Sequence, residues 1–141
     1  MEAVRVFREI IDVENFLREI HEVERKHGVR IMPVNGDVVF GEDQLRGAVM
    51  HAERNFLTGR NSARDFKTEV MRYIACERQI RSALIRAGIK EGTEKFVLLI
   101  LGAGFDSGEI LRDLGLSGDG FIKEERDKVD GALEAMALLD L

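Results

Sequence analysis

The spacing of hydrophobic residues along the chain predicts about five helices. In each segment the apolar positions recur every three to four residues, which is typical of a helix with one buried face. Asp12 stands where a side chain caps the first helix, and Gly28 and Gly59 stand where the first and second helices end. The five segments are 12–26, 42–58, 62–87, 106–114 and 123–139.

The third helical segment carries one irregularity. Glu77 interrupts its apolar stripe just after Cys76. A lone buried carboxylate is costly. Either the helix breaks near Cys76–Glu77, or Glu77 is partly buried against an arginine.

Four short runs of β-branched and aromatic residues predict strands. The run at 96–101, FVLLIL, is uninterrupted and therefore indicates a central strand. Asn35-Gly36 predicts a hairpin turn between two of the others, because both residues tolerate positive φ. The four predicted strands are 4–7, 29–32, 38–40 and 96–101. Helices and strands alternate without a regular βαβ rhythm, so we expect an α+β fold with a short, mostly antiparallel sheet. A length of 141 residues predicts a single small domain, 1–141.

Charge is distributed unevenly along the chain. Residues 46–90 hold ten basic residues against four acidic ones, a local balance of +6; the whole chain carries −5, so the remainder carries −11. A basic surface on an acidic body favours an anionic partner. An ordinary solvated helix face is the competing interpretation. The chain has no apolar stretch long enough for a bilayer and no signal-peptide pattern, and its one cysteine, Cys76, cannot form an internal disulfide. We therefore expect a cytoplasmic protein.

The remaining candidates for catalytic or cofactor chemistry are weak. The glycine-rich stretch Gly102–Gly108 resembles a dinucleotide-binding turn, but its third glycine is one position late and Asp106 would face the phosphates. We interpret it as a strand-to-helix turn. The three histidines show no metal-ligand spacing, and no nucleophile motif is present. We expect no enzyme activity, no metal and no cofactor.

The junction at Gly59-Arg60-Asn61 is the best candidate site. One helix ends there and another begins, and exposed backbone amides flanked by Arg60 and Arg64 are suited to bind phosphate. Asn61, Gln79 and Tyr73 are candidates to hydrogen-bond or stack with unpaired bases.

These residues carry a family resemblance. The chain resembles the PRPK-binding protein family, the accessory subunit that binds the small atypical kinase of the KEOPS complex. Cys76 stands where a small residue such as glycine is expected in that family. The resemblance lies in His51-Ala52, Arg54-Asn55-Phe56, Gly59-Arg60-Asn61, Glu69, Glu77-Arg78-Gln79-Ile80, Ala83-Leu84 and Gly88-Ile89-Lys90.

The resemblance implies a non-catalytic role in making threonylcarbamoyladenosine in tRNA. Members bind and stimulate the kinase, and they engage tRNA at its single-stranded 3′ CCA end. For tRNA binding the resemblance implies Arg60, Asn61, Arg78 and Gln79, to which charge position adds Arg64, Lys67 and Arg81. For kinase binding we favour the apolar C-terminal helix, with Leu133, Met136, Leu138 and Leu139, although the same residues would serve equally well as core. The alternative is a protein-only adaptor whose basic helix binds an acidic partner surface.

Overall fold

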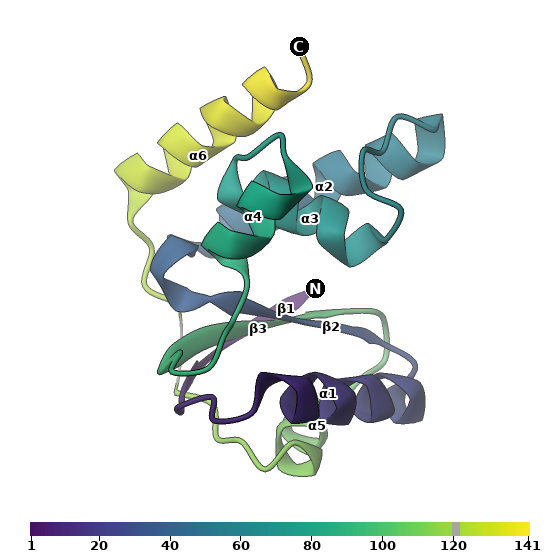
Figure 1. Ribbon diagram of the computed structural model, residues 1–141, viewed down its shortest axis with the longest axis vertical. Helices are drawn as coiled ribbons and strands as arrows, with labels where there is room; N and C mark the ends of the chain where they lie inside the picture. The colour runs from purple at the N-terminus through teal and green to yellow at the C-terminus, as the bar shows by residue number, and fades with distance from the viewer. Residues whose placement is uncertain (120–121) are drawn as a thin grey trace. The chain divides into compact units, whose positions relative to one another are not determined.

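The computed structural model describes residues 1–119 and 122–141 and divides the chain into two compact units (Figure 1). The first unit, built from residues 1–36 and 89–121, contains the sheet. The second, built from residues 37–88 and 122–141, is helical. The described residues form six α-helices and one antiparallel sheet, which confirms the predicted α+β class. One domain over 1–141 stays a prediction.

The sheet has three strands, with the predicted central strand in the middle. β1 (Glu2–Phe7) and β2 (Arg30–Asn35) both pair antiparallel with β3 (Lys95–Leu101), in the order β1-β3-β2. Val4 is paired with Leu98, and Ile31 with Ile100. β3 is buried from Phe96 to Ile100, as its unbroken apolar sequence predicts.

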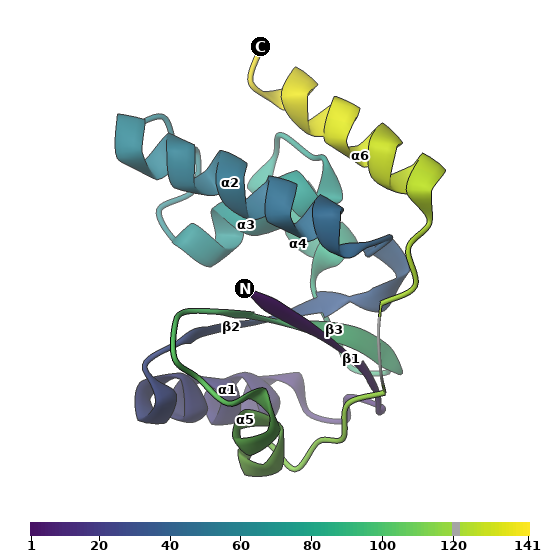
Figure 2. The same cartoon turned by 180° about the vertical axis from the view of Figure 1, so that it is seen from behind.

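Two helices, α1 (Val13–His27) and α5 (Ser107–Asp113), lie on one face of this sheet (Figures 1 and 2). The Asp12 carboxylate accepts from the Asn15 N–H at 3.0 Å, and Gly28 ends α1 in the left-handed region at φ 65°. Phe16 of α1 packs edge-on against Phe96 of β3, with ring centroids 5.5 Å apart. Both predicted ends of α1 are therefore confirmed.

The predicted hairpin at Asn35-Gly36 is wrong. β2 continues through Asn35 and pairs with β3, and Gly36–Val38 forms a 3-10 turn, η1. The backbone groups of Val38 and Phe40, which would pair with a neighbouring strand in a hairpin, instead hydrogen-bond to a side chain. The Gln44 amide accepts from the Phe40 N–H at 2.6 Å and donates to the Val38 carbonyl at 2.8 Å. Gln44 is fully buried, so this amide replaces the ladder that the apolar sequence VVF suggests.

The helical unit contains α2 (Glu42–Thr58), α3 (Phe66–Ala75), α4 (Ile80–Ala87) and α6 (Arg126–Leu139). α2 has the predicted bounds and ends at Gly59, φ 69°. α6 approaches α2 closely at Gly47, where an added Cβ would lie 2.6 Å from Cδ2 of Leu133. The core comes mainly from Leu45, Ala48, Val49, Ala52, Val70, Tyr73, Ile74, Val129 and Met136.

The predicted third helix is two helices. Cys76 adopts the left-handed region at φ 54° and ends α3, and α4 begins only at Ile80, so the helix breaks. The N-terminal boundary at Ser62 is also wrong, because Asp65 is the cap and accepts from the Thr68 N–H at 3.1 Å. The Ser62 N–H is already committed to the Glu69 carboxylate. The second alternative is also confirmed, because Glu77 is half-buried and its carboxylate lies 3.6 Å from the Arg86 guanidinium.

Candidate functional site

The helical unit contains an open hollow of about 240 Å³ at the junction highlighted by the sequence. Its walls come from the end of α2, the loop after Gly59, the C-terminal part of α3 and the end of α6. Gly59 turns the chain sharply and brings that loop back beside α3. The lining residues are Arg54, Asn55, Thr58, Arg60, Ser62, Arg72, Tyr73, Leu139 and Asp140.

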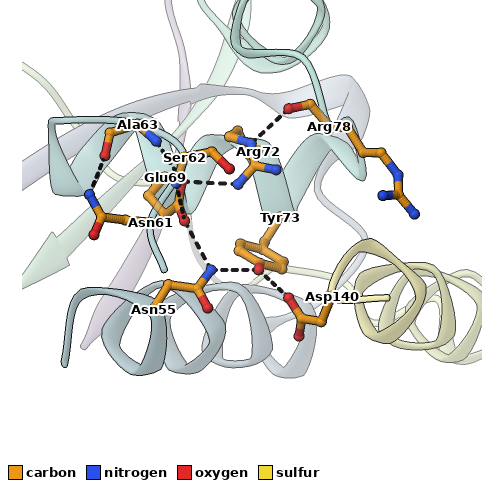
Figure 3. A network of polar contacts seen from close by, with 9 residues as sticks. All are labelled: Asn55, Asn61, Ser62, Ala63, Glu69, Arg72, Tyr73, Arg78 and Asp140. Atoms are coloured by element: carbon orange, nitrogen blue, oxygen red, sulfur yellow. Dashed lines mark hydrogen bonds and ion pairs between the residues drawn. The ribbon is translucent and has the colours of Figure 1, made fainter. Parts of the chain in front are cut away.

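A buried carboxylate shapes the loop of this hollow. Glu69, fully buried on α3, accepts from the backbone N–H groups of Ser62, at 3.2 Å, and Ala63, at 3.1 Å. It also accepts from Asn55 Nδ2 and from Arg72, each at 2.9 Å (Figure 3). Burial by itself raises the pKa of the Glu69 carboxyl, but the combined hydrogen bonds from these four donors lower it. Glu69 is therefore the anionic centre that orders the loop.

A second group of contacts holds the end of α6 against α2 and α3. The Tyr73 hydroxyl donates to Asp140 at 2.5 Å and accepts from Asn55 Nδ2 at 2.7 Å (Figure 3). His51 stacks on the Tyr73 ring with centroids 4.7 Å apart, and its Nδ1 lies 2.9 Å from Asp140. Burial and the hydrogen bond to Asp140 raise the pKa of Tyr73. Arg78 donates to the Leu138 carbonyl at 3.1 Å.

The hollow is net positive. Arg54, Arg60 and Arg72 contribute guanidinium groups, and Asp140 is the one carboxylate among the lining residues. The charge of Arg72 is balanced by its buried ion pair with Glu69, whereas the guanidinium groups of Arg54 and Arg60 are exposed to solvent. A volume of about 240 Å³ is below the range of roughly 300–1,000 Å³ usual for small-molecule sites. The hollow therefore suits a phosphate group or a single nucleotide at the end of a chain better than a large cofactor.

The structure separates the seven predicted tRNA-binding residues. Only Arg60 lines the hollow. Asn61 lies beside it and donates to the Ala63 carbonyl at 2.7 Å, which shapes the loop. Arg78 anchors α6, as described above, and its own carbonyl accepts from Arg72 Nε at 2.9 Å. The other four lie outside the lining of the hollow: Arg64, Lys67, Gln79 and Arg81.

Four residues line this hollow that were not predicted to belong to a site around Gly59: Arg54, Arg72, Leu139 and Asp140. Arg54 could have been predicted from the sequence, because it stands five residues before Gly59, in the last turns of the predicted helix, and next to Asn55. No sequence pattern indicates Asp140, because it lies far along the chain from Gly59. The prediction that Tyr73 stacks on a base is wrong. Its side chain is buried and one face of its ring is taken by His51.

The four predicted kinase-binding residues also differ from one another. Met136 is fully buried and Leu133 is half-buried against Gly47, so both contribute to the contact between α6 and α2. Leu138 is 60% exposed. Leu139 is half-buried and lines the hollow. Their role in kinase binding stays a prediction, and Leu138 and Leu139 are the two that a partner can reach.

The glycine-rich stretch of the sheet unit has the structure of a simple helix cap. Asp106 accepts from the backbone N–H groups of Gly108, at 2.9 Å, and Glu109, at 3.3 Å. Its carboxylate thus occupies the amides that a dinucleotide site would present to pyrophosphate. Within the described residues no group of three His, Cys, Asp or Glu is arranged to hold a metal ion, and no helix is long and apolar enough to span a membrane.

Comparison with known protein families identifies one that covers most of the chain. A family described as kinase binding protein CGI-121 matches residues 7–128, which confirms the resemblance identified from the sequence. The match includes the whole of the loop after Gly59 and ends shortly after α6 begins. No curated protein matches the chain.

Proposed function

This chain belongs to the kinase binding protein CGI-121 family, and we propose that it is a non-catalytic subunit of the KEOPS complex. In this proposal it binds and stimulates the small atypical kinase. It also recruits tRNA through the 3′ CCA end for threonylcarbamoyladenosine modification. The family supplies the kinase partner, and the arginine-lined hollow is the observation that supports the RNA role.

The hollow offers the two kinds of contact that a single-stranded 3′ end requires. Arg54 and Arg60 are exposed cations at its rim, placed to pair with phosphates. Ser62 and Thr58 add polar groups inside it. A duplex end is too wide for about 240 Å³, so shape favours an unpaired terminal base or a phosphate over a helix.

The buried network makes this site rigid before RNA arrives. Glu69 binds the backbone of Ser62 and Ala63, so the loop that carries Arg60 is ordered by contacts within the protein. A pre-organised loop loses less conformational freedom on binding, which increases affinity. In this proposal Glu69 and Asn55 are positioning residues, and Arg54 and Arg60 contact the RNA.

The test compares tRNA with and without its CCA end at low salt. We expect Arg60→Glu to weaken binding of intact tRNA by about tenfold or more, because it places a carboxylate at a phosphate contact. Arg25→Glu is the matched control, since it changes net charge equally but lies on the exposed face of α1. We expect Arg25→Glu to leave binding near wild type, and removal of CCA to reduce the effect of Arg60→Glu.

Two results would contradict the RNA role. If intact and CCA-less tRNA bind wild-type protein equally, the 3′ end is not the ligand. If Arg60→Glu and Arg25→Glu weaken binding equally, the effect is one of net charge and the hollow is not a site. Either result favours the protein-only adaptor, in which the basic residues contact an acidic protein surface.

A further inference from the structure

α4 presents its large apolar side chains to solvent and its small ones to the protein. Its two buried residues are Ala83 and Ala87, both fully buried. Its three large aliphatic residues, Ile80, Leu84 and Ile85, are 37%, 45% and 69% exposed. An ordinary surface helix has the opposite arrangement, with its large apolar residues inside.

The packing of α4 explains how this arrangement is tolerated. α3 ends at Cys76, and the turn after it lays α4 beside α3 (Figure 1). Alanines at the contact allow two helices to approach closely, so α4 needs no large side chain to close the core. Ile85 is mostly free of that contact, and Ile80 and Leu84 each leave more than a third of their surface to solvent. Single exposed apolar residues are common, but three on one helix of two turns form a patch.

Arginines border this patch. Arg81 lies on α4 between Ile80 and Leu84 in sequence, and Arg78 stands two residues before the helix; both are exposed, and Arg78 also donates to the neutral carbonyl of Leu138. Arg86 is also exposed and lies 3.6 Å from Glu77, so part of its charge is balanced locally. The surface thus combines aliphatic groups with excess positive charge, and a complementary surface combines aliphatic groups with carboxylates.

The chemistry of the patch favours protein over RNA. Unpaired bases bind best by stacking on aromatic rings, and the α4 sequence IRSALIRA contains none. Branched aliphatic side chains gain most from contact with other aliphatic side chains. The hollow provides exposed cations beside polar groups, whereas α4 provides cations beside aliphatic groups.

We propose that the exposed face of α4, formed by Ile80, Arg81, Leu84 and Ile85, docks an acidic amphipathic helix of a partner protein. In this arrangement the aliphatic residues of the partner cover Leu84 and Ile85, and its carboxylates pair with Arg81 and Arg78. The inference divides the basic segment 46–90 into an RNA-facing part around Arg60 and a protein-facing part on α4. It does not depend on the tRNA proposal, because it uses none of the exposed residues of the hollow.

The test uses three designed helical peptides of equal length, measured by fluorescence anisotropy with the full chain. One peptide carries leucine and glutamate on one face, the second leucine and lysine, and the third serine and glutamate. We expect the leucine–glutamate peptide to bind at least tenfold more tightly than the other two. Ile85→Ser and Arg81→Glu should each weaken that binding by about tenfold, which is 1.4 kcal/mol.

Leu57→Ser is the matched control. Leu57 is 87% exposed on α2, against 69% for Ile85, so the variant removes at least as much exposed apolar surface away from α4 and should bind the peptide like wild type. Thermal unfolding verifies that Ile85→Ser remains folded, and an exposed position predicts a melting temperature close to wild type.

Three outcomes would overturn the proposal. The first is equal binding of the three peptides, or equal loss in Leu57→Ser and Ile85→Ser. The second is tenfold weaker binding of a single-stranded RNA oligonucleotide to Ile85→Ser with peptide binding unchanged, which would assign α4 to RNA. The third is self-association in sedimentation that Ile85→Ser abolishes, which would make a second copy of this chain the occupant. Loss of tRNA binding in Arg60→Glu with peptide binding retained would leave the α4 proposal standing.

Discussion

Arg72 donates to the carboxylate of Glu69 at 2.9 Å, and both side chains are buried one helical turn apart on α3. The pair connects two parts of the helical unit. Glu69 orders the loop that carries Arg60, and Arg72 holds the carbonyl of Arg78 at the start of the turn into α4. One ion pair thus supports both the proposed RNA site and the proposed protein-docking helix.

Removal of the carboxylate should strongly destabilise the protein. Glu69→Ala leaves the Arg72 guanidinium buried without its counter-ion, and it leaves the Ser62 and Ala63 N–H groups without an acceptor. We expect a loss of about 3–5 kcal/mol in the free energy of unfolding, measured with urea. Glu53→Ala, at an exposed position of α2, should change stability by less than about 0.5 kcal/mol. Equal effects of the two variants would contradict the role of the network.

The same carboxylate predicts the acid sensitivity of the fold. The pKa of Glu69 is lower in the folded protein than its ordinary value of 4.5, so the unfolded chain binds the proton more readily. The stabilisation is therefore present above that ordinary value and is lost as the pH falls toward the folded-state pKa. We expect the wild type to lose stability between about pH 5 and pH 3 more steeply than Glu69→Gln. Parallel pH profiles would show that other carboxyl groups dominate.

Cys76 is a site where a substitution should stabilise the protein. It is the one non-glycine residue at positive φ among those described, at φ 54°, and this conformation costs an L-residue roughly 1 kcal/mol. We expect Cys76→Gly to raise the free energy of unfolding by a few tenths to about 1 kcal/mol. Cys76→Ala, which removes the thiol but keeps the Cβ, separates strain from the sulfur contacts. If Cys76→Gly is less stable than Cys76→Ala, backbone strain is not the governing factor.

The contact between Tyr73 and Asp140 should couple the end of α6 to the core. Tyr73→Phe removes the hydroxyl that bridges Asn55 and Asp140, and we expect a loss of about 1–2 kcal/mol. A double-mutant cycle with Asp140→Asn should give a coupling energy of at least about 0.5 kcal/mol. Amide exchange at the end of α6 should accelerate in both single variants. Strict additivity together with unchanged exchange would mean that α6 is held by its apolar contacts alone.

Kinase binding should depend on Leu138, the leucine of α6 that is exposed. Leu138→Glu places a charge on the reachable part of this helix, and we expect the affinity for the kinase to fall by about tenfold or more while the domain stays folded. Leu57→Glu is the control, because Leu57 is also exposed but lies on α2. Co-purification of the kinase with Leu138→Glu at wild-type yield would place the kinase contact elsewhere.

Local patterns predicted the elements that are stabilised by their own sequence. α1 and α2 have capping or terminating residues at their ends, and β3 is apolar without interruption, so propensity, burial and boundaries agree. The family was identifiable for a similar reason, since the short segments that carry the resemblance all lie within one stretch of the chain, residues 51–90. The hairpin failed because Gln44, a polar residue on the following helix, provides the hydrogen bonds of Val38 and Phe40. No local pattern indicates that contact.

The α+β class, the excess of positive charge between residues 46 and 90 and the turn that carries Arg60 all follow from local patterns along the chain. The use of that charge depends on contacts between residues that are far apart in the chain. Arg72 forms a buried ion pair with Glu69, and Arg78 donates a hydrogen bond to the end of α6. The chain turns at Cys76, and α4 after it leaves aliphatic side chains exposed. These outcomes depend on which distant groups meet in space, because an arginine with a buried partner and an arginine facing solvent have the same local sequence signature.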